Sequence, residues 1–252
     1  MRTPLIAGLT LLLVTACGGS KPAGPAPATP AATADATPAA AGSAAGGTTA
    51  APTGATANPV TGIGGRTGEL LNPDNNAMVF LYYDLAGIAP PIDRWVEDDS
   101  RVKYGPAIEK ASQRVAVRAE LEAGVAAVRG AGVIRLSLNS ANLSDYDPTY
   151  GEFTVRALAP SSVVEFAALG QKVALRFANG KYAQVWRVPA AEAQGIRDRI
   201  STGYNVDLDV LLAIKSVLPG PSGGTITADV VEYEMRETRG GTTLARVRVA
   251  AP

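Results

Sequence analysis

The second half of the chain alternates between apolar and polar residues, which is the pattern of half-buried β-strands. Because successive side chains of a strand point to opposite faces of a sheet, each alternating run predicts a strand with one face toward a core. The runs cover residues 133–138, 153–158, 172–177, 182–188, 204–217, 225–237 and 242–250.

Two glycine-containing turns separate neighbouring runs. Asn179-Gly180 lies between the third and fourth runs, and both residue types accept the positive φ of a type I′ turn, so a β-hairpin is predicted there. Gly240-Gly241 predicts a second hairpin between the last two runs. Residues 219–224 form the loop that precedes them.

Helical spacing appears earlier in the chain. A helix is predicted over residues 77–85, with Asp74 or Asn75 as its N-cap and Gly87 at its end. A short helix is also predicted over residues 189–200. The apolar residues of the first helix fall on one face: Met78, Leu81, Tyr82 and Leu85.

A longer helix is predicted over residues 105–129, with Pro106 in its first turn. Its apolar residues form two stripes on nearly opposite sides, so the helix is either covered on two faces or broken near Gly124. One stripe is Ile108, Ala111, Val115 and Ala119, and the other is Val117, Leu121, Val125 and Val128.

The helices precede the strands instead of alternating with them, which favours antiparallel connections over βαβ units. We therefore expect an α+β fold, in which N-terminal helices pack on a mainly antiparallel β-sandwich or curved sheet of about seven strands. Residues 66–252 are predicted to form a single globular domain, a length that is ample for one core.

The first residues of the chain have a different character. Arg2 precedes an apolar run over residues 5–14, which has the length of a signal-peptide core and is too short to span a bilayer. Small residues follow, and then Cys17, which is the one cysteine of the chain. We interpret residues 1–16 as a signal peptide that is removed, and the lack of a second cysteine excludes an internal disulfide.

The segment Val14-Thr15-Ala16-Cys17 resembles the lipobox of bacterial lipoproteins. The resemblance implies that cleavage precedes Cys17, that its thiol is thioether-linked to a diacylglyceryl group, and that fatty acids such as palmitate hold the protein on a membrane. Gly18, in place of an aspartate, resembles the outer-membrane class. The alternative is an ordinary secreted protein with a chance cysteine near its cleavage site.

Residues 17–65 are predicted to be a disordered linker behind the lipidated Cys17. Beyond the cysteine this segment consists of Ala, Pro, Thr, Gly and Ser with few other residues, and only Lys21 and Asp35 are charged. Such a composition buries too little apolar surface to offset its ordering entropy. The alternative, that its proline runs are peptide ligands, lacks a repeated motif.

Charge and composition exclude several functions. The formal net charge is zero, and no basic excess or polybasic cluster indicates nucleic acid or anionic lipid as a partner. The chain has no histidine, which excludes Ser-His-Asp and Cys-His catalysis and nearly all zinc sites. Carboxylate chemistry, serine with lysine, and a calcium-type site remain for an enzyme.

Four pairs of carboxylates are candidates for acid–base chemistry, and a solvated strand face is the simpler interpretation of the last two pairs. The pairs are Asp98/Asp99, Asp145/Asp147, Asp207/Asp209 and Glu232/Glu234. Residues 139–148 hold Asn and Asp oxygens that suit either a hard cation or a turn before Pro148. The aromatic residues suit a glycan or peptide groove, or a core. No catalytic, cofactor or metal residue is assigned.

Residues 136–197 resemble uncharacterised domains of proteobacterial lipoproteins. The resemblance rests on Tyr146-Asp147 followed by Phe153, on the Asn179-Gly180 segment, and on Val188-Pro189 with a short helix. We expect a lipoprotein on the periplasmic face of the outer membrane, held by acyl chains on Cys17. Its domain is expected to be a non-enzymatic binding or assembly module for an envelope protein or glycan. The alternative is a carboxylate-dependent hydrolase of an envelope polymer.

Overall fold

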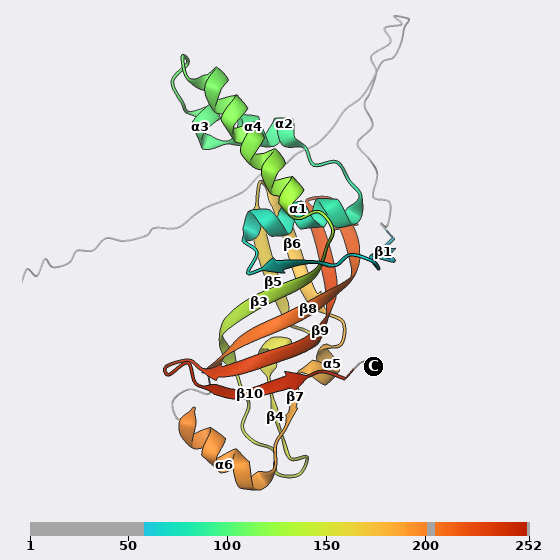
Figure 1. Cartoon of the computed structure of the whole chain (residues 1–252), viewed down its shortest axis with the longest axis vertical. Helices are drawn as coiled ribbons and strands as arrows, with labels where there is room; N and C mark the ends of the chain where they lie inside the picture. The colour runs from blue at the N-terminus through green and yellow to red at the C-terminus, as the bar shows by residue number, and fades with distance from the viewer. Residues whose placement is uncertain (1–57, 201–204, 251–252) are drawn as a thin grey trace, which may run out of the picture. The chain divides into compact units, whose positions relative to one another are not determined.

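The computed structural model describes residues 58–200 and 205–250 (Figure 1). The chain divides into two units, Met1–Ala51 and Pro52–Pro252, and the described residues all belong to the second unit. The predicted signal peptide, Cys17 and most of the predicted linker lie outside the described residues. Within the described residues, no helix is long and apolar enough to cross a membrane. The predicted end of the linker at residue 65 is wrong, because Val60 and Thr61 form a strand that pairs with Val217 and Ser216.

The fold combines helices with one large sheet and one small sheet, which confirms the predicted α+β class. The large sheet has eight strands in the order β2-β3-β8-β9-β6-β5, with β1 beside β8 and β10 beside β9. Its strands are β1 (Val60–Thr61), β2 (Gly68–Leu71), β3 (Ala131–Asn142), β5 (Val163–Ala168), β6 (Gln171–Phe177), β8 (Asn205–Gly220), β9 (Gly223–Glu237) and β10 (Thr243–Arg248).

This sheet differs from the predicted one in number and direction of strands. It is mixed, because β2 runs parallel to β3 and β6 runs parallel to β9, while the other neighbours are antiparallel. Two further strands, β4 (Glu152–Thr154) and β7 (Val185–Arg187), form a separate antiparallel pair. The predicted run over residues 153–158 ends early, because a 3₁₀ turn, η1 (Arg156–Leu158), follows β4.

The long hairpin of β8 and β9 runs through the whole sheet (Figure 1). Its register extends from Val206 opposite Glu237 to Gly220 opposite Gly223. One half of the hairpin pairs with β1 and β6, and the other half pairs with β3 and β10. On β8 the residues 206, 208, 210, 212 and 214 are all buried, so the intervening residues lie on the opposite face of the sheet.

Helix α1 (Asn75–Ala86) forms where the sequence predicts it, and the Asp74 side chain caps it by accepting a 2.7 Å hydrogen bond from the Ala77 N–H. The helix contacts β5, β6, β8 and β9 on the sheet and α4 (Lys110–Ala127). It is therefore buried on more than the one predicted face. The buried residues are Met78, Val79, Phe80, Leu81, Tyr82, Tyr83 and Leu85.

Three helices extend from one end of the sheet: α2 (Ile92–Asp98), α3 (Ser100–Lys103) and α4 (Figure 1). Helix α4 continues through Gly124, where a Cβ atom would lie 2.5 Å from the ring of Phe80, so the predicted break is wrong. Burial on two faces is wrong as well. Val117 is buried, whereas Ile108 and Val115 of the other stripe are 91% and 70% exposed.

The Asn179-Gly180 segment does not form the predicted hairpin. Asn179 is buried with φ of −97°, and Gly180 begins the short helix α5 (Gly180–Ala183). A Cβ atom on Gly180 would lie 2.8 Å from the Leu158 carbonyl oxygen, so the glycine permits close packing instead of a turn. The tight turn lies at Leu169-Gly170, with φ of 54° and 71°, and it joins β5 to β6.

The aromatic residues near β4 and β7 belong to the core. The rings of Phe153 and Trp186 stack with their centroids 5.3 Å apart, and the ring of Tyr146 lies 5.1 Å from that of Phe153. The Tyr146 hydroxyl donates a 2.9 Å hydrogen bond to the Val188 carbonyl. Helix α6 (Ala190–Arg199) follows, close to its predicted bounds. Core packing therefore accounts for these three rings.

Candidate functional site

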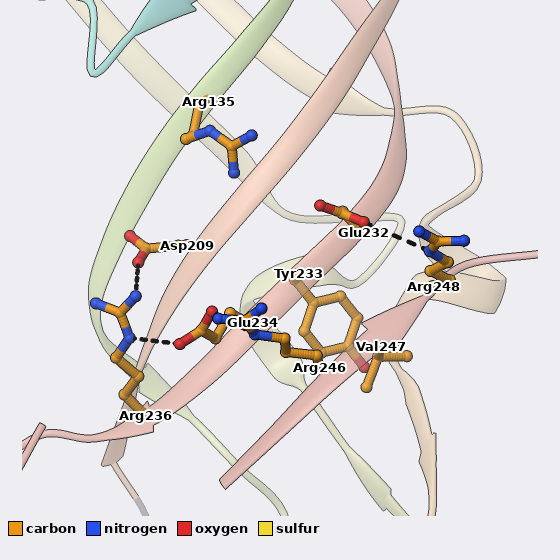
Figure 2. A pocket seen from close by; sticks show the side chains of 9 residues that line it. All are labelled: Arg135, Asp209, Glu232, Tyr233, Glu234, Arg236, Arg246, Val247 and Arg248. Atoms are coloured by element: carbon orange, nitrogen blue, oxygen red, sulfur yellow. Dashed lines mark hydrogen bonds and ion pairs between the residues drawn. The ribbon is translucent and has the colours of Figure 1, made fainter. Parts of the chain in front are cut away.

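Charged side chains gather on the face of the sheet opposite the core, around a hollow of about 710 Å³ that we call the charged hollow (Figure 2). Strands β3, β8, β9 and β10 supply its charged residues, which on β9 and β10 occupy alternate positions and so point to one face. The lining residues are Arg135, Asp209, Glu232, Tyr233, Glu234, Arg236, Arg246, Val247 and Arg248.

The strand register places two carboxylates directly opposite each other, since Asp209 of β8 pairs with Glu234 of β9. Like charges at opposed positions repel. Arg236 offsets this repulsion by bridging both carboxylates, with Nη2 3.0 Å from Asp209 Oδ2 and Nε 2.8 Å from Glu234 Oε1 (Figure 2). The Ser137 hydroxyl also donates to Asp209, at 2.6 Å.

Glu234 is the most heavily bonded carboxylate of the hollow. Besides Arg236, it accepts from the Thr243 hydroxyl at 2.8 Å, and its Oε2 lies 2.8 Å from Arg246 Nε. The hydrogen bonds from Arg236 and Thr243, together with the arginine charges, lower the pKa of Glu234 to about 2. Glu234 is therefore ionised at neutral pH and does not donate a proton there.

On the β10 side of the hollow the arginines reach solvent. The side chains of Arg246 and Arg248 are 78% and 92% exposed, and Arg248 Nε lies 3.7 Å from Glu232 Oε2. Arg135 of β3 pairs with Glu69 of β2 at 3.0 Å. Four arginines and three acidic residues line the hollow, so its lining has a net charge of +1.

The four carboxylate pairs do not meet in one cleft. Glu232 and Glu234 line the charged hollow with Asp209, whereas Asp207 accepts hydrogen bonds from the Ser140 N–H at 2.8 Å and the Thr238 hydroxyl at 3.3 Å. Within each of these two pairs, Asp207/Asp209 and Glu232/Glu234, the residues occupy alternate positions of one strand, which fits the simpler interpretation as a strand face.

The other two pairs lie elsewhere and have local roles. Asp98 ends α2 and pairs with Arg94, while Asp99 caps α3 by accepting from the Arg101 N–H at 2.8 Å. Hydrogen bonds from Arg101 lower the pKa of Asp99. A glycosidase needs one carboxyl group whose pKa is raised. The shifts at Asp99 and Glu234 run in the opposite direction.

Residues 139–148 adopt strand and turn structure. Asn139 and Asn142 belong to β3, and Asp147 accepts from the N–H groups of Thr149 at 2.8 Å and Tyr150 at 3.3 Å. Within residues 58–200 and 205–250 no three His, Cys, Asp or Glu residues are grouped so that they could hold a metal ion. The geometry of Asp147 fits the turn interpretation.

The arginines of the charged hollow were absent from the sequence-based candidates. The signal that locates them is charge alternation: Glu232, Glu234 and Arg236 occupy alternate positions of one predicted strand, as Arg246 and Arg248 do in the next. Such spacing places them on one face. Cys17, the predicted lipidation site, lies outside the described residues.

Comparison of the chain with known proteins gave no match of any of three kinds. The chain matches no protein-family model. No curated protein matches it. No solved structure matches it either.

Proposed function

We propose that this chain is a bacterial envelope lipoprotein whose folded domain is a non-enzymatic binding or assembly module. In this proposal Cys17 carries the acyl chains, the residues between Cys17 and β1 form the linker, and the folded domain, which begins with β1, faces the periplasm from the outer membrane. The lipobox-like segment ending at the one cysteine supports the anchor. Two or three acyl chains hold a protein on a membrane far more firmly than one.

The charged hollow is the proposed binding site, and its ligand is an anionic group of an envelope partner. The observation that supports this most is the contrast between its two sides. Arg236 is held between Asp209 and Glu234, whereas Arg248 is 92% exposed and lies 3.7 Å from Glu232. Arg246 lies between these cases, because it bonds Glu234 at 2.8 Å and is 78% exposed. An arginine guanidinium presents a planar set of donors that matches a carboxylate or a phosphate.

The same geometry gives little support to the hydrolase alternative. A carboxylate-dependent hydrolase requires one carboxyl group that is protonated near neutral pH. In the charged hollow, hydrogen bonds from Arg236 and Thr243 lower the pKa of Glu234 to about 2, so this carboxyl group is ionised near neutral pH. Charge recognition therefore fits these residues better than proton transfer.

Photo-crosslinking in intact cells tests the proposal. A photoreactive residue at position 231 of the full-length chain replaces Val231, which lies on β9 next to Glu232 and is partly exposed. We expect a discrete crosslinked product from this position and none from Tyr150, an exposed position in a turn. Equal labelling from both positions would contradict a specific site at the charged hollow.

A further inference from the structure

A second hollow, of about 590 Å³, lies between β10 and the segment that contains α5 and β7, and we call it the edge groove. Figure 1 shows the end of β10 next to α5 and β7. The residues that line the edge groove are Lys181, Tyr182, Val185, Trp186, Arg187, Arg246, Val247, Arg248, Val249 and Ala250.

Both walls of the edge groove are edges of sheets. Among the described residues, β10 pairs with β9 alone and β7 pairs with β4 alone. Just after β10, the Val249 N–H donates to the Val231 carbonyl at 2.9 Å, in register with the pairing of Arg248 and Glu232, so Val249 is a bonded position opposite β9. Since bonded positions alternate along an antiparallel strand, the backbone N–H and C=O groups of Arg246 and Arg248 point away from β9.

A free edge of this kind can accept an added strand, because its outward backbone groups offer a ready ladder of hydrogen bonds. The apolar side chains of the groove add to this. Val247 of β10 and Val249, which follows β10, line one wall. Trp186 of β7 lines the opposite wall, and its ring stacks on that of Phe153. An incoming strand therefore meets a backbone ladder and apolar contacts together.

The charge of the edge groove defines what kind of strand it takes. Its lining contains four cationic side chains, Lys181, Arg187, Arg246 and Arg248, and no acidic residue. Arg187 is 83% exposed, and its Nε lies 3.9 Å from Glu152 Oε2. This pairing is loose, so the Arg187 guanidinium can also bind a carboxylate of the occupant. Complementarity therefore requires acidic side chains on the occupant.

The predicted linker of the chain does not meet this requirement. Over residues 18–65 it contains one acidic residue, Asp35, and one basic residue, Lys21. A segment of another protein, with several Asp or Glu residues in an extended stretch, satisfies both the backbone and the charge of the groove.

We propose that the edge groove binds an extended acidic segment of a partner protein, which adds as a strand to the free edge of β10. This inference rests on the proposed binding function and specifies the chemical nature of the partner. The acidic side chains contact Lys181, Arg187 and Arg248, while Arg246 keeps its bond to Glu234. The backbone pairs with the outward groups of Arg246 and Arg248.

The test uses the full-length protein and a fluorescently labelled octapeptide in which glutamate alternates with valine, followed by fluorescence anisotropy. A second peptide has the same sequence with N-methyl groups on all of its backbone nitrogens, so it keeps the charges but has no N–H group to donate to a ladder on either edge. We expect saturable binding of the first peptide at one site, and binding of the second peptide weakened about tenfold by the lost backbone hydrogen bonds.

Two substitutions of Arg248 separate the contribution of its backbone N–H to peptide binding from the contribution of its charge. R248P removes an outward N–H without removing a bond to β9, and proline is tolerated on edge strands. R248Q removes the charge alone and is expected to weaken binding about two- to fivefold. R248P is expected to weaken binding about tenfold or more, because it also removes one backbone donor.

Three results would overturn the inference: equal binding of the two peptides, equal effects of R248P and R248Q, or no binding at all. If R248P does not fold, as judged by circular dichroism, the N-methylated peptide gives the same test with the natural chain. If the peptide does not bind but the crosslink from position 231 persists, the inference about the edge groove is wrong and the proposed binding function still stands.

Discussion

The side chain of Asn179 pairs with the backbone of Val230 as a neighbouring strand would. Asn179 Nδ2 donates to the Val230 carbonyl at 2.8 Å, and Asn179 Oδ1 accepts from the Val230 N–H at 2.8 Å. Both groups are buried, and they lie just beyond Phe177, where the parallel pairing of β6 with β9 ends. One amide thus satisfies two backbone groups that the ladder no longer reaches.

Asn179→Ala is therefore expected to destabilise the domain by about 2–4 kcal/mol, because it leaves a buried donor and a buried acceptor without partners. Denaturant unfolding of the two proteins measures the difference. Asn142→Ala, at an exposed position of β3, is the matched control and is expected to change stability by less than about 0.5 kcal/mol. Equal effects of the two substitutions would contradict the structural role of Asn179.

Tyr233 and Tyr146 give a pair of substitutions with opposite expected signs. Among the described residues the buried Tyr233 hydroxyl finds no hydrogen-bond partner, and burial raises the pKa of Tyr233. Tyr233→Phe removes this unsatisfied group and is expected to leave stability unchanged or to raise it by up to about 1 kcal/mol. Tyr146→Phe loses the bond to the Val188 carbonyl and is expected to cost about 1 kcal/mol. Thermal unfolding that ranks the two variants the other way would contradict this assignment.

Glu234 is expected to make stability depend on pH in the acid range. Its pKa is lowered from 4.5 to about 2 in the folded protein, so its contribution is fully present above pH 4.5 and is lost as the pH falls toward 2. The stability difference between the natural protein and Glu234→Gln is therefore expected to shrink between pH 5 and pH 2. Asn142→Ala, at an exposed position of β3, removes no titratable group and is the control with an unchanged difference. A Glu234→Gln difference that is constant with pH would contradict the network.

The anchor makes a separate prediction at Cys17, which lies outside the described residues. Cys17→Ala is expected to abolish labelling by a radioactive or clickable fatty acid and to release the protein from the membrane fraction, because no thiol remains for acylation. A variant that stays in the membrane fraction would show that another part of the chain holds it there.

Local signals predicted the elements whose stability is local. The cap at Asp74, helix α1 and the strands β8, β9 and β10 follow from residue periodicity and turn chemistry close to their observed bounds. The turn at Leu169-Gly170 was not predicted, because leucine is a rare residue at positive φ and gives no turn signal.

Features that depend on distant partners were not predictable. Asn179-Gly180 has the composition of a hairpin turn, but Val230, which is 51 residues away, takes the asparagine side chain as a strand substitute. The parallel pairing of β2 with β3 and of β6 with β9 likewise depends on long-range register. The charged hollow combines both cases: the alternation of Glu232 and Glu234 is visible in the sequence, and the approach of Arg246 comes from the fold.

The most direct test of the proposed binding function repeats the crosslinking from position 231 in two variants with the same change in charge. R246Q/R248Q removes the two exposed arginines of the charged hollow, and R129Q/R199Q removes two exposed arginines that do not line it. We expect the crosslinked product to fall about tenfold in the first variant and to stay at the natural level in the second, since the arginines contact the partner. An undiminished product in R246Q/R248Q, or an equal loss in both variants, would contradict a binding site at the charged hollow.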